Sequence, residues 1–192
     1  MASQTYRIAV YGSHSGELDE RASVAAQTLG QELAKRGHVL LTGGGKGLPH
    51  KVAKVAAAEG GKVIAYSFAR SPEEHAESGL PTEGFSEIRY VPANYELGDN
   101  VEARRLYRNI TTVNQADAVI CISGRWGTLN EAANAEHMAK PIGVVIGTGG
   151  TADELPALMR RLKSARGAFF IAAEDPVYVL DALEGHLDPT QN

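Results

Sequence analysis

The sequence has a single cysteine and no long apolar run. Cys121 lies inside the apolar stretch AVICI and has no second cysteine to pair with, which excludes an intrachain disulfide framework. No stretch approaches the roughly 18 consecutive apolar residues of a membrane-spanning helix. The first residues, MASQTYRIAVYG, show no basic segment followed by an apolar one, as a signal peptide would. We therefore expect a cytoplasmic protein.

The sequence also lacks a strong excess of charge of either sign. Nineteen Lys and Arg residues against 23 Asp and Glu residues give a formal net charge of −4 over 192 residues. This balance gives no global reason to expect a nucleic-acid polymer or an anionic membrane as partner, so an anionic ligand must be held by a local site. The length predicts one domain over residues 1–188, followed by a short tail at 189–192.

Several well-known motifs are absent. The six histidines include no H-x-x-x-H pair, and no serine lies in a G-x-S-x-G pattern, so we expect neither a metal site nor a serine nucleophile. Lys46 is followed by glycine rather than by serine or threonine, which excludes the phosphate loop of Walker-type nucleotide hydrolysis. The sequence predicts no bound cofactor.

Short apolar runs alternate with helical patterns along almost the whole chain. Seven runs have the composition of buried strands: YRIAVYG, HVLLTGGG, GKVIAYS, SEIRYVP, ADAVICISG, PIGVVIG and AFFIAA. Six segments carry apolar residues at helical spacing: Glu20–Arg36, Leu48–Glu59, Asp99–Ala116, Thr128–Met138, Ala152–Arg166 and Asp175–Leu187. This alternation predicts an α/β fold, namely a Rossmann-like, doubly wound and mostly parallel sheet of about seven strands with helices on both faces.

The stretch Ala69–Pro81, ARSPEEHAESGLP, has no apolar periodicity and contains two prolines. We predict a surface excursion. A lid over a ligand is the alternative.

The turn after the second strand, TGGGKGLPH, is rich in glycine. In a parallel α/β sheet the ligand crevice lies outside the carboxyl ends of the strands. Gly43, Gly44, Gly45 and Gly47 would let backbone N–H groups approach a phosphate at the positive end of the following helix. The alternative is that the glycines only provide the positive φ of a tight turn. His14 and His50 fall in the first two strand-end turns, where a ligand could bind.

The turn after the fifth strand, SGRWGTLNE, allows two interpretations. Thr128 followed three residues later by Glu131 fits a capping box, in which the two side chains satisfy N–H groups at a helix N-terminus. The same turn presents Arg125 and Trp126 between two glycines, which suits a binding loop at a strand's carboxyl end.

The helical segment before the fifth strand carries Arg104, Arg105 and Arg108, with Arg104 and Arg108 one turn apart. One interpretation is a solvated basic face paired with Glu102. The other is that one arginine points over the sheet end toward a phosphate or sugar, where its guanidinium binds oxyanions in bidentate fashion.

Together these turns resemble the LONELY GUY (LOG) family of nucleotide phosphoribohydrolases, also labelled lysine decarboxylase-like, within the Rossmann-like nucleotide-binding superfamily. The family motif P-G-G-x-G-T-x-x-E aligns with the nine residues Ser123–Glu131. The glycine-rich family loop aligns with GGGKGLPH, and a Gly-Ser pair after the first strand with Gly12 and Ser13. A family arginine, nine residues before the aspartate that opens the fifth strand, aligns with Arg108.

The resemblance implies a homodimer that hydrolyses the N-glycosidic bond of a nucleoside 5′-monophosphate to free base and ribose 5-phosphate. Glu131 would be the catalytic carboxylate, and Arg108 would orient the substrate. The remaining predicted site residues would hold the phosphate and ligand: Gly12, Ser13, Gly43, Gly44, Gly45, Lys46, Gly47, Ser123, Gly124, Arg125, Trp126, Gly127 and Thr128.

Two positions depart from the family pattern. Ser123 replaces the proline of the motif and Arg125 its second glycine, and these changes resemble a more distant branch that includes a molybdenum-cofactor carrier. The alternative prediction is therefore a non-catalytic carrier or sensor of a phosphorylated nucleotide or pterin cofactor. In both cases we expect a small phosphorylated molecule as partner.

Overall fold

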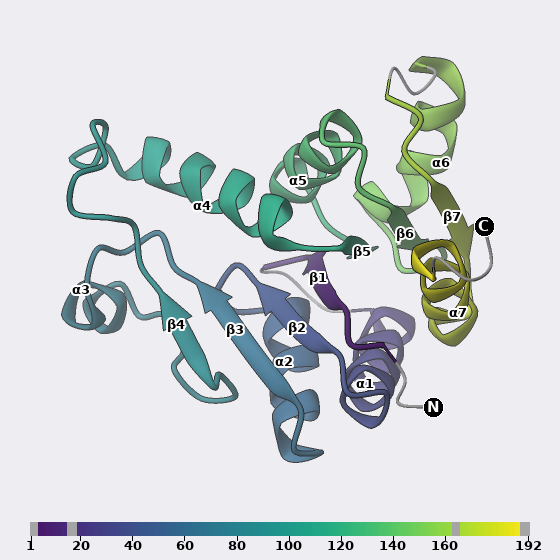
Figure 1. Cartoon of the computed structure of the whole chain (residues 1–192), viewed down its shortest axis with the longest axis horizontal. Coiled ribbons are helices and arrows are strands. Elements are labelled where there is room, and N and C mark those ends of the chain that lie inside the picture. Colours follow the sequence, from purple (N-terminus) through teal and green to yellow (C-terminus); the bar gives the residue numbers. More distant parts are fainter. Residues whose placement is uncertain (1–3, 15–18, 163–165, 189–192) are drawn as a thin grey trace.

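The apolar runs of the sequence form seven parallel strands. The computed structural model describes residues 4–14, 19–162 and 166–188; the predicted tail at 189–192 lies outside these residues. The strands are β1 (Arg7–Gly12), β2 (Val39–Thr42), β3 (Lys62–Tyr66), β4 (Glu87–Arg89), β5 (Ala118–Ile122), β6 (Ile142–Val145) and β7 (Phe170–Ala173). Their order in the sheet is β4-β3-β2-β1-β5-β6-β7 (Figure 1).

Helices cover both faces of this sheet (Figure 1). Ile8 and Val10 point to the face packed by α1 (Glu20–Lys35), α2 (Leu48–Ala58) and α7 (Pro176–Leu187). Ala9 and Tyr11 point to the face packed by α4 (Val101–Gln115), α5 (Trp126–His137) and α6 (Thr151–Leu162). Because both faces are covered, β5 and β6 are buried along their whole length. The predicted Rossmann-like, doubly wound fold is confirmed, with every strand parallel.

The stretch predicted as a surface excursion contains a short helix, α3 (Pro72–Glu77), which its residue pattern did not indicate. Ser71 caps α3 by accepting a hydrogen bond from the Glu74 N–H. His75 is fully buried, with Nδ1 bonded to Ser67 Oγ and Nε2 bonded to the Pro81 carbonyl, each at 2.8 Å. The buried His75 side chain is thus bonded to residues on both sides of α3, Ser67 before it and Pro81 after it.

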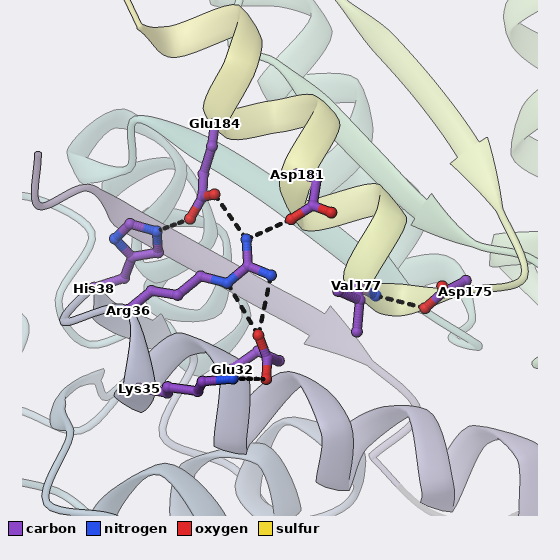
Figure 2. Close-up of polar contacts among 8 residues, drawn as sticks. All are labelled: Glu32, Lys35, Arg36, His38, Asp175, Val177, Asp181 and Glu184. Carbon is purple, nitrogen blue, oxygen red and sulfur yellow. Dashed lines mark hydrogen bonds and ion pairs between the residues drawn. The ribbon is translucent and has the colours of Figure 1, made fainter. Parts of the chain in front are cut away.

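A cluster of charges fastens α7 to the end of α1 (Figure 2). Arg36 pairs with Glu32 on α1 at 3.0 Å and with Asp181 and Glu184 on α7 at 2.6 and 2.7 Å. His38 Nε2 contacts Glu184, while His38 Nδ1 accepts the Tyr6 N–H at 3.3 Å. This acceptor role places the proton of a neutral His38 on Nε2, where it can be donated to Glu184. Within the described residues, no helix is long and apolar enough to cross a membrane.

Candidate functional site

The largest concentration of predicted site residues surrounds a cavity of about 440 Å3, which we call the central cavity. It lies at the carboxyl ends of β1 and β2 and beside the N-terminus of α5. The chain changes its direction of progress across the sheet between β1 and β5, and this switch point is where open α/β sheets bind ligands. The walls also include α4 and residues 68–80.

The glycine-rich turn joins β2 to α2. Gly47 has φ +87°, and a Cβ there would lie 2.1 Å from the Ser13 carbonyl oxygen, so no other residue fits at this position. The Leu48 N–H, the first of α2, already donates to that carbonyl at 2.9 Å, and Pro49 has no N–H. The α2 terminus therefore offers few free donors to a phosphate, although Gly43, Gly45 and Lys46 line the cavity.

Arg108 reaches from α4 across to this turn. Its Nη1 donates to the Gly43 carbonyl at 2.7 Å, and its Nε donates to Asn109 Oδ1 at 3.0 Å. A Cβ at Gly43 would lie 2.8 Å from Nη1, so the missing side chain makes room for the guanidinium. Burial lowers the pKa of Arg108, and the nearby Glu131 partly opposes this shift. Arg108 thus points over the sheet end, as the second interpretation of this helix expected for one of its three arginines.

The interpretation of α4 as a solvated basic face was wrong for Arg104. This side chain is buried, pairs with Glu74 of α3 at 2.7 Å and donates to the Phe68 carbonyl at 3.2 Å. Arg105 is exposed and pairs with Glu102 at 2.8 Å. The three arginines therefore have three different partners: Arg104 pairs with Glu74 of α3, Arg105 pairs with Glu102, and Arg108 bonds to the turn after β2.

The capping-box interpretation of the turn after β5 was also wrong. Helix α5 begins at Trp126 with Arg125 as N-cap, two residues before the predicted start, and no described side chain caps it. The first N–H groups of a helix have no acceptor within the helix. Gly127 and Thr128 in this first turn line the central cavity, and a Cβ at Gly127 would touch nothing within 4 Å. The α5 terminus therefore presents backbone donors to the cavity.

Glu131 lies one turn further along α5 and faces the same cavity. Only 7% of the residue is exposed, and among the described residues it forms no hydrogen bond or ion pair. Burial raises the pKa of Glu131 to about 8, although the positive charge of Arg108 opposes the shift. Burial therefore favours the protonated form of Glu131, which can donate a hydrogen bond.

Two further polar atoms are buried in the walls. Tyr11 Oη and Thr42 Oγ1 have no hydrogen-bond partner within the described part of the chain, and both residues line the central cavity. Buried hydroxyl groups are nearly always hydrogen-bonded in folded proteins, so these two groups mark places where a polar ligand fits. Burial, together with Glu131, raises the pKa of Tyr11 and keeps its hydroxyl protonated.

The structure brings most of the predicted site residues to this cavity. Those that line it are Gly12, Gly43, Gly45, Lys46, Arg108, Arg125, Gly127, Thr128 and Glu131. The others lie outside it: Ser13, Gly44, Gly47, Ser123 and Gly124 form the turns beneath it, and Trp126 points to a neighbouring groove. His14, which falls in the turn after β1, lines the cavity, whereas His50 bonds to the Glu83 carbonyl at 3.0 Å.

Sequence reasoning missed several wall residues. Tyr11 is the last residue but one of β1 and Thr42 is the last of β2, so their position at a strand's carboxyl end was a usable signal. Phe68, Ser78 and Leu80 had no such signal, because they reach the cavity only through the fixed position of the segment around α3. In the described ranges, no group of three or more His, Cys, Asp or Glu side chains could hold a metal ion.

The chain belongs to the SLOG cluster4 family, whose profile it matches over residues 5–177. It is 31% identical over 141 residues to an uncharacterized protein of Archaeoglobus fulgidus, covering 71% of this chain and 77% of that protein. The LOG resemblance is thus confirmed at the level of the superfamily fold, while the LOG reaction stays a prediction.

Solved structures with the same fold have different partners. The molybdenum cofactor binding protein of Rippkaea orientalis has a TM-score of 0.71 at 20% identity, covering 96% of this chain and 99% of that one. The molybdenum cofactor carrier protein of Chlamydomonas reinhardtii has a TM-score of 0.70 at 20% identity, covering 96% and 98%. DNA processing protein A of Helicobacter pylori, which binds single-stranded DNA, has a TM-score of 0.61 at 20% identity, covering 80% and 72%. These likenesses establish the fold alone.

Proposed function

We propose that this protein is a non-catalytic carrier or sensor of a small phosphorylated ligand, a nucleotide or a pterin cofactor, which it holds in the central cavity. One observation carries the proposal: α5 directs an uncapped N-terminus into the cavity. Phosphate binds at such helix ends because the free N–H groups and the helix dipole both favour an anion.

The contrast with other helices strengthens this argument. Asp19, Ser71, Asn100 and Asp175 each cap a helix by accepting a backbone N–H, and Figure 2 shows the Asp175 cap of α7. These helix ends have a protein partner. The α5 terminus is left for a ligand.

The side chains around the cavity complement a phosphate. Lys46, Arg105, Arg108 and Arg125 all line it, in a chain whose formal net charge is −4. Arg108 is preorganised by its bond to the Gly43 carbonyl, so it loses little side-chain freedom on binding. The hydroxyl groups of Tyr11 and Thr42 would find in a ligand the partner that they lack.

The state of Glu131 favours binding over glycoside hydrolysis. Cleavage of an N-glycoside develops positive charge on the sugar, which an ionised carboxylate stabilises. Burial raises the pKa of Glu131 to about 8 and so favours its protonated form, and a bound phosphate would raise the pKa further. A neutral Glu131 serves as a hydrogen-bond donor to the ligand.

The comparisons support the same choice. Two of the similar structures are molybdenum cofactor proteins. A third, DNA processing protein A, binds single-stranded DNA. We favour a small molecule over DNA because the donors converge on a cavity rather than on an exposed basic stripe.

The experiment measures binding by calorimetry and thermal shift, with 5′-mononucleotides set against the matching nucleosides. We expect the nucleotides to bind and stabilise the protein, and the nucleosides to do neither. Lys46→Ala and Arg108→Met should each weaken binding roughly tenfold, since each removes a charge-assisted contact. Arg160→Ala on the exposed part of α6 is the control and should change nothing. Equal binding of nucleotides and nucleosides, or no binding at all, contradicts the proposal.

A second candidate is the phosphoribohydrolase suggested by the LOG resemblance. The observation in its favour is that Arg108 and Glu131 line the same cavity. Here the protonated Glu131 would donate its proton to the leaving base while water attacks the sugar carbon, and the resulting Glu131 carboxylate would take a proton from that water. Release of free base from a mononucleotide, lost in Glu131→Gln, would establish this reaction in place of the carrier.

The predicted homodimer also stays a prediction. Leu106 and Ile110 on α4 are 52% and 46% exposed, and apolar side chains of this size favour burial against a partner. Sedimentation velocity of the wild type and of Leu106→Lys tests whether this face pairs two copies.

A further inference from the structure

A second hollow lies directly beside the central cavity. It has a volume of about 350 Å3 and lies between α5 and α6, which cover the same face of the sheet (Figure 1). We call it the α5–α6 groove. Trp126, Leu129, Leu155 and Leu158 provide its apolar lining, with Arg125 and Arg161 also along it.

The groove and the central cavity share one lining residue. Arg125 lines both, and it is the N-cap of α5. After Arg125, the first residues of α5 line one hollow or the other. Gly127 and Thr128 line the cavity, whereas Trp126 and Leu129 line the groove. A ligand phosphate at the α5 terminus would therefore lie at the boundary between the two.

The boundary is held in place by α6. The Thr151 N–H donates to the Gly124 carbonyl and the Thr151 hydroxyl donates to the Arg125 carbonyl, each at 2.9 Å. The Ala152 N–H donates to the Ser123 carbonyl at 3.0 Å. These bonds fix the distance between the loop and α6, so the groove is part of the fold.

Trp126 is the unusual member of this lining. Its exposed fraction is 84%, although tryptophan is on average one of the more deeply buried residues. An exposed indole beside a phosphate site is a surface on which a planar heterocycle stacks. The charged residues along the same groove are Arg125, Arg161 and Glu154.

We propose that the ligand has two ends: its phosphate binds at the α5 terminus and a second planar heterocycle stacks on Trp126 in the α5–α6 groove. This assigns the ligand to the class of dinucleotides joined through phosphate, rather than to mononucleotides. The inference rests on the proposed function, because the phosphate in the central cavity fixes the starting point of the second half.

The test uses matched pairs of probes. Each of the four common 5′-mononucleotides is compared with the symmetric dinucleoside pyrophosphate built from it, so the two members of a pair differ by one nucleotide half. Trp126 is the only tryptophan of the chain, so its fluorescence reports directly on the groove. Calorimetry gives the affinities for the wild type, for Trp126→Ala and for Tyr178→Ala, a control at an exposed aromatic residue on α7.

We expect at least one dinucleotide to bind more tightly than its mononucleotide and to change Trp126 emission more strongly. In Trp126→Ala the ratio of the two affinities should fall roughly tenfold, as expected for the loss of one stacking contact, and in Tyr178→Ala it should stay as in the wild type.

Three other outcomes overturn the inference in distinguishable ways. If paired probes bind equally and Trp126→Ala leaves the ratio unchanged, the groove holds no second half, and the proposed function still stands. If no probe binds, both proposals fail. If Trp126→Ala instead turns a dimer into a monomer in sedimentation velocity without altering the ratio, the groove is a contact between copies of this chain and the inference is wrong.

Discussion

At the scale of single residues, the surroundings of Glu131 decide what its carboxyl group can do. Both interpretations of the T-x-x-E spacing, a cap and a catalytic carboxylate, assume an ionised side chain near a helix N-terminus. The spacing identified a functional position, but it carried no information on burial. With 7% of the residue exposed and no described hydrogen-bond partner, the neutral form is favoured. The carboxyl group of Glu131 would therefore act as a hydrogen-bond donor rather than as a negative charge.

This change makes a prediction about stability and pH. The folded-state pKa of Glu131, about 8, lies above its ordinary value of 4.5. The folded protein therefore binds more protons than the unfolded chain between these values, and its stability falls as pH rises from about 5 to 8. Glu131→Gln removes this loss, so by pH 8 the free energy of unfolding of the variant should exceed that of the wild type by about 1–3 kcal/mol. Urea unfolding across this pH range measures the difference. A destabilisation at every pH would indicate a lost cap instead.

Gly127 provides a second prediction at this scale. A Cβ at this position meets nothing within 4 Å, and alanine favours a helix over glycine by up to about 1 kcal/mol. Gly127→Ala should therefore keep or raise stability in thermal unfolding, while its methyl group occupies ligand space and weakens nucleotide binding in calorimetry. A variant that binds as tightly as the wild type would place the ligand away from α5.

At the scale of helices and turns, the two glycine-rich turns differ in a way that their sequences do not reveal. The sequences of both turns predicted contacts with a phosphate. However, the first N–H of α2 is already bonded to the Ser13 carbonyl, while the α5 terminus is uncapped. The reason is a long-range contact, because Ser13 approaches Gly47 only when β1 and β2 are paired. Local sequence therefore located the turns but could not rank them.

The contact between α1 and α7 is a further property of elements that can be tested. Arg36 bridges Glu32, Asp181 and Glu184 (Figure 2), and only 19% of its side chain is exposed. Arg36→Met removes the cation that these three carboxylates share, so we expect a loss of about 1–3 kcal/mol in urea unfolding and faster hydrogen exchange in α7. Lys35→Ala is the matched control: its side chain is 76% exposed in the pair with Glu32, and exposed pairs contribute little. Equal effects of the two variants would contradict this account.

At the scale of the whole molecule, the fold was predictable and the reaction was not. The strands and six of the helices follow from the period of their apolar residues, which is a local property. Helix α3 was missed because its one buried anchor, His75, is polar and is explained only by Ser67 and Pro81. The choice between carrier and hydrolase depends on the burial of Glu131, which arises from the packing of α4 and α5 on the sheet.

The central claim is that backbone N–H groups at the start of α5 bind a ligand phosphate. The most direct measurement is a titration of the 15N-labelled protein with each 5′-mononucleotide in turn, followed through the amide resonances. We expect the Gly127 and Thr128 amides to shift with a saturable dependence on at least one nucleotide, and not on the matching nucleoside, because phosphate accepts hydrogen bonds from these donors. Saturable binding that leaves both amides unshifted, or no binding by any nucleotide, would contradict the claim.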